Sequence, residues 1–286
     1  MMTPTPAPAA AKGDNGARTV ALVGDFIQTQ LASHRKTWSS QHSTPPPPLL
    51  VGVQGPQGCG ASLGPHAGPC SSSLTPRTCA GKSHLTSLLP PYLAKSAHAI
   101  STASLSLDDL YLPHAGLAAL AAAHPTNTLV HGRGQPGTHD VALGASVLSA
   151  LRHGAPVALP VFDKSLFSGQ GDRSALVVPV PERVDVVIFE GWMMGFGPLA
   201  SGEIEKRWSD PAFADRLDYD LPFLKQHSVE DLEFVNQELA KYEALWKGIG
   251  CFVMLRPESM EYVWQWRLEV RLSLRHLMLP SCGLGC

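Results

Sequence analysis

A short apolar run followed by a glycine-rich turn constrains the fold of this chain more than any other feature. LLVGVQ, residues 49–54, has the composition of a buried parallel strand, which is apolar on both faces. GPQGCG follows it at residues 55–60, and GKS stands at residues 81–83, ahead of an apolar helical segment. A strand, a glycine loop, a lysine with a hydroxyl residue, and a helix are the parts of a phosphate-binding loop, G-x-x-x-x-G-K-[ST].

This pattern is complete only when residues 61–81, or residues 60–80, are passed over. Either choice leaves GPQGCGKS, with Gly60 or Gly81 as the last glycine. In such a loop backbone N–H groups surround the phosphates, the lysine neutralises their oxygens and the hydroxyl ligates Mg²⁺, so we expect ATP and Mg²⁺ to bind. A chance match in a glycine-rich segment is the alternative. The expected nucleotide-binding residues are Gly55, Pro56, Gln57, Gly58, Cys59, Gly60, Gly81, Lys82, Ser83 and His84.

The interrupting segment, residues 61–81, is rich in Gly, Pro, Ser and Cys and has no hydrophobic period, so we do not expect it to pack. Closing a loop of this length costs roughly 2.7 kcal/mol plus a constant. The loop would nevertheless separate the glycines from the lysine, although both must lie around the same anion. A second hypothesis is a translated intron, because the codons of Gly60 and of Ala80–Gly81 can supply GT and AG. A mature transcript that retains the segment would contradict this hypothesis.

The rest of the chain alternates between strand-like and helix-like segments. Apolar residues at helical spacing predict a helix over residues 18–37, which the run QHSTPPPP ends. HAISTASLSLDDLYL, VDVVIFEGW and GCFVMLRPE are typical of further strands, and helical segments are expected at roughly 84–97, 114–123, 141–153 and 229–246. This alternation predicts an α/β fold with a parallel sheet flanked by helices. Ligands of such sheets bind at the carboxyl ends of the strands.

Acidic residues stand at the ends of two of these strands. Asp108 and Asp109 end SLDDLY, where a carboxylate could orient or deprotonate an acceptor hydroxyl. A helix cap is the simpler alternative. Glu190 ends the apolar run IFE in the arrangement that directs a carboxylate toward Mg²⁺, although an ordinary strand-end acid would look the same. We therefore expect Asp108, Lys82 and Glu190 to be catalytic, and Ser83 and Glu190 to hold the metal.

Two glycine-rich segments combine both signs of charge. HGRGQPGTHD covers residues 131–140, and FDKSLFSGQGDR covers residues 162–173, which we expect to be a loop. Arginine suits bidentate contact with a carboxylate, so these segments favour an anionic, hydroxylated substrate, with solvated surface loops as the alternative. His131 and His139 have no third ligand at a spacing typical of metal sites. The expected substrate-binding residues are Asp109, Tyr111, Arg133, His139, Asp140, Asp163, Lys164 and Arg173.

Composition narrows the classes of protein that remain. The chain has 286 residues, 44% of them hydrophobic, which is enough for one large domain. A formal net charge of −2 gives no basic footprint for nucleic acid. No apolar run reaches the ~18 residues of a membrane span. The sequence has six cysteines and no recognisable secretory signal. We therefore expect free thiols in a protein of the cytoplasm, with the nucleus as a further compartment. Residues 1–17 are expected to be a disordered tail.

GPQGxGKS, SLDDLY, GRGQPGTHD, FDKSLFSGQGDR and VVIFEGWMMGF, in this order, resemble the D-glycerate 3-kinase family of plants and fungi. That family belongs to the P-loop kinases, with uridine kinase, phosphoribulokinase and pantothenate kinase. The resemblance covers roughly residues 18–269 without residues 61–81. It implies an adenylate-kinase-like, three-layer α/β/α domain that transfers phosphate from ATP to D-glycerate with Mg²⁺. It also matches Asp108 to a base-like aspartate and Glu190 to the carboxylate of an F-E-G motif.

The end of the chain departs from the family pattern. Residues 270–286, VRLSLRHLMLPSCGLGC, match nothing in it, and a Val270 codon begins with GT, as a second retained intron would. Two competing hypotheses therefore stand beside glycerate phosphorylation. One is a P-loop kinase for a nucleoside or pantothenate. The other is a catalytically inactive nucleotide-fold protein. In each case we expect a monomer with a small-molecule ligand, without nucleic acid or membrane.

Overall fold

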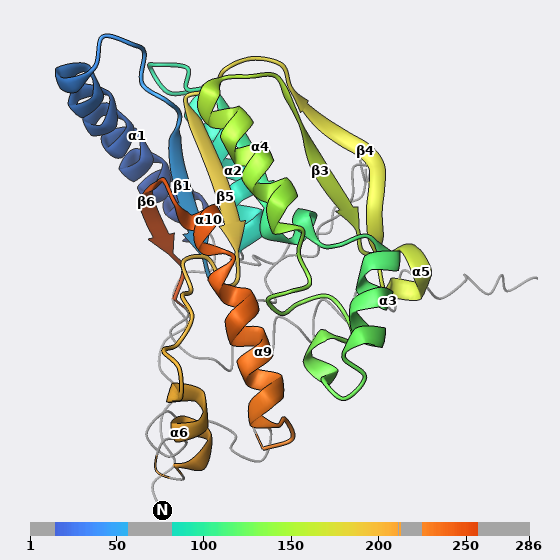
Figure 1. Ribbon diagram of the computed structural model, residues 1–286. Helices are drawn as coiled ribbons and strands as arrows, with labels where there is room; N and C mark the ends of the chain where they lie inside the picture. The colour runs from blue at the N-terminus through green and yellow to red at the C-terminus, as the bar shows by residue number, and fades with distance from the viewer. Residues whose placement is uncertain (1–14, 57–81, 211, 213–224, 257–286) are drawn as a thin grey trace, which may run out of the picture.

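The computed structural model describes residues 15–56, 82–210, 212 and 225–256 (Figure 1). Its centre is a parallel sheet with the strand order β2-β5-β1-β6. These strands are β1 (Leu49–Gln54), β2 (Thr102–Ser106), β5 (Val186–Gly191) and β6 (Ile249–Met254). All three pairings are parallel, so the sheet predicted from the alternating sequence is confirmed. Every residue of β5 is buried, as expected for an inner strand apolar on both faces.

Helices cover both faces of this sheet and give the expected three layers. On one face α1 (Asn15–Gln41) and α2 (Lys82–Ala94) pack on side chains such as Val51 and Ile188. On the other face α4 (Val141–His153) and α10 (Glu243–Trp246) pack on side chains such as Leu105 and Phe189. Figure 1 shows α4 in front of the sheet and α1 and α2 behind it. Alternate strand residues therefore belong to two separate cores.

A second, two-stranded sheet lies beside the central one. It pairs β3 (Val157–Asp163) with β4 (Asp172–Val180) in antiparallel fashion, and the short helix α5 (Leu166–Gly169) joins them. The expectation of a single loop over 162–173 was wrong at both ends, because these residues finish one strand and start the next. The connection needs glycine: Gly171 has φ +83°, and a Cβ there would stand 2.3 Å from the Phe162 ring.

The remaining elements surround the carboxyl ends of the central strands. They are η1 (Leu107–Leu110), α3 (His114–Ala123), η2 (Thr128–Val130), α6 (Glu203–Ser209) and α9 (Val229–Ala240). Helix α9 begins with a capping box between Ser228 and Asp231. The helix expected over 229–246 ends at Ala240 and resumes as α10, so it is two helices. Residues 61–81 and 270–286 lie outside the described residues, as does most of the tail expected over 1–17.

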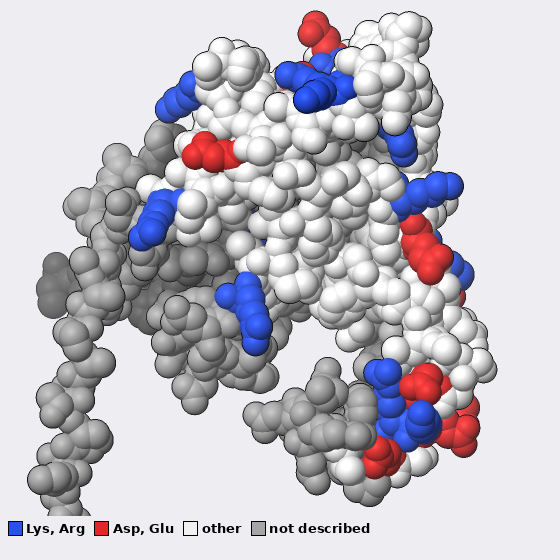
Figure 2. Space-filling view, turned by 90° about the vertical axis from the view of Figure 1, so that its left-hand side faces the viewer, with Lys and Arg blue, Asp and Glu red and all other residues white. Residues whose placement is uncertain are grey.

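Figure 2 shows the face that α1 presents, where lysines and arginines are dispersed between large uncharged areas. Helix α1 has exposed apolar side chains, among them Leu22 and Phe26. Within the described ranges, no helix combines the length and the apolar character needed to cross a membrane.

Candidate active site

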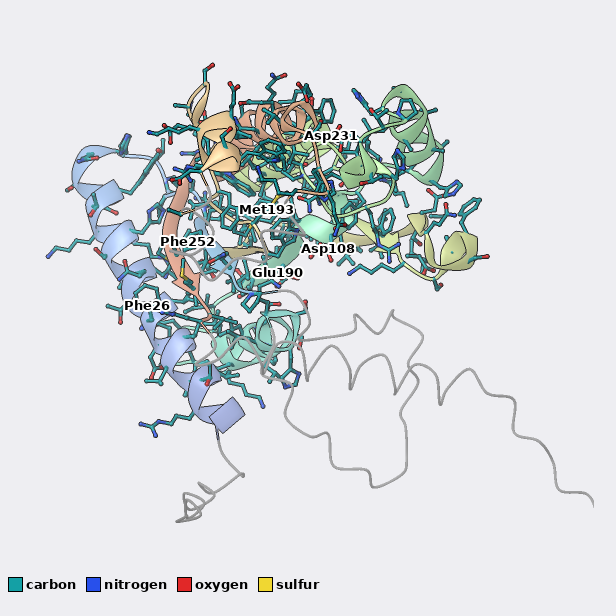
Figure 3. All side chains as sticks on the ribbon, turned by 90° about the horizontal axis from the view of Figure 1, so that it is seen from below. Phe26, Asp108, Glu190, Met193, Asp231 and Phe252 are labelled. Atoms are coloured by element: carbon teal, nitrogen blue, oxygen red, sulfur yellow. The ribbon has the colours of Figure 1, made fainter. Side chains whose placement is uncertain are left out.

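The register of the central sheet brings the predicted site residues to one edge. Glu190 is paired with Val53 on one side and with Ser106 on the other. Gly55 and Asp108 each follow two residues later, so the three neighbouring strands β1, β5 and β2 end together. Figure 3 views this edge from below, with Asp108 and Glu190 labelled on it. The parallel arrangement predicted from the sequence therefore explains why these residues gather.

The described part of the phosphate-loop motif is Gly55, Pro56 and Lys82–His84. Lys82 is the first residue of α2, is 8% exposed, and donates from Nζ to the Pro56 carbonyl oxygen at 3.4 Å. A Cβ on Gly55 would lie 3.1 Å from Cγ of Lys82, so the strand end and the lysine stem are in close contact. The His84 side chain is exposed. Residues 57–60 and Gly81, also assigned to the motif, lie outside the described residues.

Glu190 faces the hydroxyl of the same motif. Ser83 donates from Oγ to Oε1 of Glu190 at 3.1 Å, and Glu190 is only 7% exposed. Mg²⁺ prefers oxygen ligands and is usually held by one or two carboxylates together with phosphate and water. The adjacent hydroxyl and carboxylate fit that requirement. In the described residues no group of three or more His, Cys, Asp or Glu side chains forms an all-protein metal site.

Asp108 carries a carboxylate that is paired and ionised. The cap of η1 is Ser106, whose Oγ accepts the Asp108 backbone N–H at 3.3 Å, so the capping role considered for the aspartates falls to the serine. Lys164 Nζ donates to Oδ2 of Asp108 at 2.7 Å. Burial alone would raise the pKa of Asp108, but the charge and hydrogen bond of Lys164, with the charge of Lys82, hold this pKa below its ordinary value.

Asp109 has a different environment. Its Oδ1 accepts the Phe162 backbone N–H at 3.1 Å, which ties η1 to β3. Burial raises the pKa of Asp109 to about 6; the Phe162 N–H opposes this, and the charges of Asp108 and Glu190 add to it. Two consecutive aspartates thus have different partners, since Asp108 pairs with Lys164 and Asp109 accepts a backbone N–H of β3.

The GTHD part of the 131–140 segment runs beside the SLDDLYL segment. Tyr111 and His139 form an antiparallel bridge. Hydrogen bonds flank it, from Leu112 N to Thr138 O at 2.9 Å and from Asp140 N to Leu110 O at 2.7 Å. The Tyr111 and His139 rings stack with their centroids 4.3 Å apart. Two motifs far apart in sequence therefore form one wall next to Asp108.

The two arginines assigned to the substrate also hold this wall together. Arg133 donates from Nη1 to the carbonyl oxygens of Gly169 and Gln170, at 2.7 and 2.5 Å. Arg173 donates from Nη2 to the Tyr111 carbonyl oxygen at 3.0 Å and to Oδ2 of Asp140 at 3.3 Å. Each guanidinium thus already has backbone partners on a neighbouring segment.

The two predicted acids beside these arginines have local partners. Asp140 also caps α4 by accepting the Leu143 N–H at 2.9 Å. Asp163 accepts from the backbone N–H and the hydroxyl of Ser165, at 2.8 and 2.6 Å. Both carboxylates therefore shape the loops that carry them.

Tyr242, between α9 and α10, was missed by the sequence reasoning. Its hydroxyl oxygen lies 2.7 Å from Nδ1 of His139, and its side chain is fully buried. It stands in a helical stretch without any motif. Its polar contact with the wall is a product of tertiary packing, so the sequence carried no signal for it.

Comparison with known proteins identifies the family, although no family model matches the chain. The solved structure of a D-glycerate 3-kinase of Cryptococcus neoformans is similar, with 40% sequence identity and a TM-score of 0.75. The match covers 91% of this chain and 80% of the Cryptococcus chain. The uncharacterized kinase mug58 of Schizosaccharomyces pombe is 34% identical over 233 residues, which are 80% of this chain and 72% of that protein. The chain belongs to the D-glycerate 3-kinase family.

A further member of the D-glycerate 3-kinase family, the chloroplastic D-glycerate 3-kinase of Arabidopsis thaliana, is 31% identical over 257 residues. That match takes in 87% of this chain and 46% of the longer plant protein. The resemblance seen in the sequence motifs is thereby confirmed, together with the P-loop kinase fold and the class of ATP-dependent kinase.

Proposed function

We propose that this chain transfers the γ-phosphate of ATP to D-glycerate and forms 3-phosphoglycerate. The observation that carries the proposal is the meeting of two half-sites at one sheet edge. Lys82, Ser83 and Glu190 form the nucleotide half. Asp108 and Lys164 form the acceptor half. The field of Lys82 acts on Asp108, so the halves are near enough to interact. The names of the similar proteins support glycerate as the acceptor.

On the nucleotide side, Lys82 would neutralise phosphate oxygens, and Ser83 and Glu190 would hold Mg²⁺, which supplies positive charge against the negative charge that develops during transfer. The hydrogen bond between Ser83 and Glu190 fixes the two oxygen ligands in advance. Such preorganisation supplies electrostatic stabilisation without rearrangement during transfer.

On the acceptor side, Asp108 accepts the hydrogen of the substrate hydroxyl and orients its oxygen for in-line attack. The lowered pKa keeps this carboxylate ionised, so its main service is orientation. Arg133 and Arg173 already donate to backbone carbonyls, whereas Lys164 Nζ has Asp108 as its one partner among the residues that the structure describes. Lys164 is therefore the cation we assign to the substrate carboxylate.

The proposal is tested with a panel of acceptors offered to a variant that lacks residues 61–81. D-glycerate should be phosphorylated with the highest kcat/KM, ahead of L-glycerate, pantothenate and uridine. Asp108→Asn in the same variant should lower kcat by at least ~10² and leave ATP affinity unchanged, because the base acts only on the acceptor. Preference for a nucleoside or pantothenate would reassign the acceptor. An unchanged kcat would remove Asp108 from the mechanism.

A further inference from the structure

His139 is enclosed between two tyrosines. Its ring stacks on Tyr111 and meets the Tyr242 ring edge-on, with centroids 5.6 Å apart and planes at 87°. The side chain is 4% exposed. Nδ1 lies 2.7 Å from the Tyr242 hydroxyl oxygen, whereas Nε2 is buried and has no hydrogen-bond partner in the described structure. One ring nitrogen is thus fixed and the other is available.

The donors around the Tyr242 hydroxyl determine which nitrogen carries the proton. The oxygen accepts the Gly137 backbone N–H at 3.1 Å. Burial raises the pKa of Tyr242, while the hydrogen bond from the Gly137 N–H acts in the opposite direction, so this N–H is a donor to the phenolic oxygen. The hydroxyl hydrogen is then left to donate, and the acceptor within reach is Nδ1. A neutral imidazole that accepts at Nδ1 carries its hydrogen on Nε2.

The ring is neutral at any ordinary working pH. Burial lowers the pKa of His139 to about 3, although the charge of Asp108 acts in the opposite direction. Nε2–H is therefore a buried, uncharged donor, and its ring stacks on Tyr111, which follows Asp108 by three residues in the same segment. A buried donor without a partner costs about 1–3 kcal/mol, so a state in which it finds an acceptor is favoured.

We propose that Tyr242 is a positioning residue, which holds His139 as the Nε2–H tautomer so that this N–H donates to the Asp108 carboxylate once Lys164 leaves it for the substrate. The inference rests on the proposed function of Asp108. In the resting structure Lys164 occupies Oδ2 of Asp108. When it turns to the substrate carboxylate, the half-buried Asp108 carboxylate loses its cationic partner, and His139 supplies a neutral donor in its place.

A neutral donor suits this place because of the charges around Asp108. The positive charges of Lys82 of α2 and Lys164 after β3 lower the pKa of Asp108. The neighbouring carboxyl group of Asp109 in η1 interacts with the charge of Asp108. The Tyr111 and His139 rings complete the surroundings. An imidazolium would add a third cation and compete for the phosphate. A neutral N–H orients the carboxylate and keeps it ionised without adding positive charge that would compete for the phosphate.

The tautomer can be measured without any substrate. In the full-length chain with ¹⁵N-labelled histidine, long-range ¹H–¹⁵N correlation spectra should show His139 as a neutral ring protonated at Nε2. The signal is assigned by its loss in His139→Gln. Tyr242→Phe should remove the single tautomer, whereas Tyr92→Phe should keep it, since Tyr92 donates to Asp25 between α1 and α2. A ring protonated at Nδ1, or a charged ring at pH 7, would overturn the inference.

The contact with Asp108 is tested in Lys164→Met, which imitates departure of the lysine. Carboxyl ¹³C titration should show that adding His139→Leu raises the pKa of Asp108 by at least ~0.5, while His139→Gln, which keeps an N–H donor, raises it less. Equal pKa values in all three variants would refute the contact.

The effect on catalysis is measured in the variant that lacks residues 61–81. There Tyr242→Phe should lower kcat/KM for D-glycerate at least ~5-fold and move the acid limb of its pH profile upward, with ATP affinity unchanged. A loss of activity that leaves the pH profile in place would mean a purely structural role. Absence of glycerate phosphorylation in every variant, with the NMR results intact, would instead reject the proposed function.

Discussion

Single residues at the sheet edge differ in what they contribute, and their hydrogen bonds separate the contributions. In the proposed mechanism Lys82, Ser83 and Glu190 serve the nucleotide, and Asp108 and Lys164 serve the acceptor, while Asp109 fastens η1 to β3. Each assignment can be tested by a substitution that keeps the shape of the side chain and removes one property.

Glu190→Gln keeps the hydrogen bond geometry with Ser83 and removes the negative charge. Because Mg²⁺ is held by charged oxygen ligands, we expect the Mg²⁺ concentration for half-maximal rate to rise at least ~10-fold. The measurement is a Mg²⁺ titration of kinase activity at fixed ATP in the variant that lacks residues 61–81. An unchanged half-maximal concentration would take Glu190 out of the metal site.

Asp109 gives a pH-dependent prediction for stability. Its folded-state pKa of about 6 lies above the ordinary value of 3.8, so ionisation destabilises the folded state increasingly as the pH rises between these values. Asp109→Asn keeps an acceptor for the Phe162 N–H and cannot ionise. The free energy of unfolding of the variant minus that of the wild type should therefore be more positive at pH 7.5 than at pH 5. Urea denaturation at the two pH values measures this difference. Equal differences at both pH values would contradict the raised pKa.

At the scale of elements, the sheet edge depends on how β3 and β4 are joined. Lys164 and Arg173 come from the two ends of this connection, and Arg133 holds its middle by the Gly169 and Gln170 carbonyls. The connection in turn depends on glycines with positive φ, at 169 and 171. The geometry of the acceptor half is therefore set by a turn outside the central sheet.

Two alanine substitutions test this dependence. Gly169 and Gly171 have φ values of +91° and +83°, but only Gly171 would place a Cβ against another atom, at 2.3 Å from the Phe162 ring. Gly171→Ala should lower the free energy of unfolding by at least ~1 kcal/mol more than Gly169→Ala, because only the former adds a clash to the backbone strain. Chemical denaturation of both variants measures the difference. Equal losses would show that the ring moves aside.

Most elements of the central sheet could be predicted because their sequences are locally unambiguous. Buried strands such as VVIFEG are apolar throughout, and α3 begins and ends where its apolar pattern does. The β3–β4 pair was missed because the 162–173 segment has the composition of a loop, and its pairing is set by contacts between residues distant in sequence. The split between α9 and α10 was missed as well, and fully buried Tyr242 lies in this break.

The candidate site could be predicted as far as its motifs extend. The strand-end acids and the described phosphate-loop residues lie at one edge of the sheet, as expected from the way parallel strands bring their carboxyl ends together. The pairing of Asp108 with Lys164, the capping by Ser106 and the contact of Tyr242 with His139 are tertiary facts that a single sequence does not contain.

For the whole molecule, the proposed acceptor half-site is continuous in the described residues, whereas the proposed nucleotide half-site is interrupted in sequence between Gly60 and Lys82. Gly55 and Lys82 are in close contact in the fold, as an uninterrupted loop requires. The hypothesis that the working protein lacks residues 61–81 therefore predicts that their removal allows the loop to enclose phosphate.

The most direct measurement follows phosphate from ATP to D-glycerate by ³¹P NMR, in the chain as written and in the variant without residues 61–81. The shortened variant should form 3-phosphoglycerate at a rate at least ~10²-fold higher than the full chain, and Asp108→Asn should abolish this gain. A shortened variant that folds and binds ATP but leaves D-glycerate unphosphorylated would contradict this account.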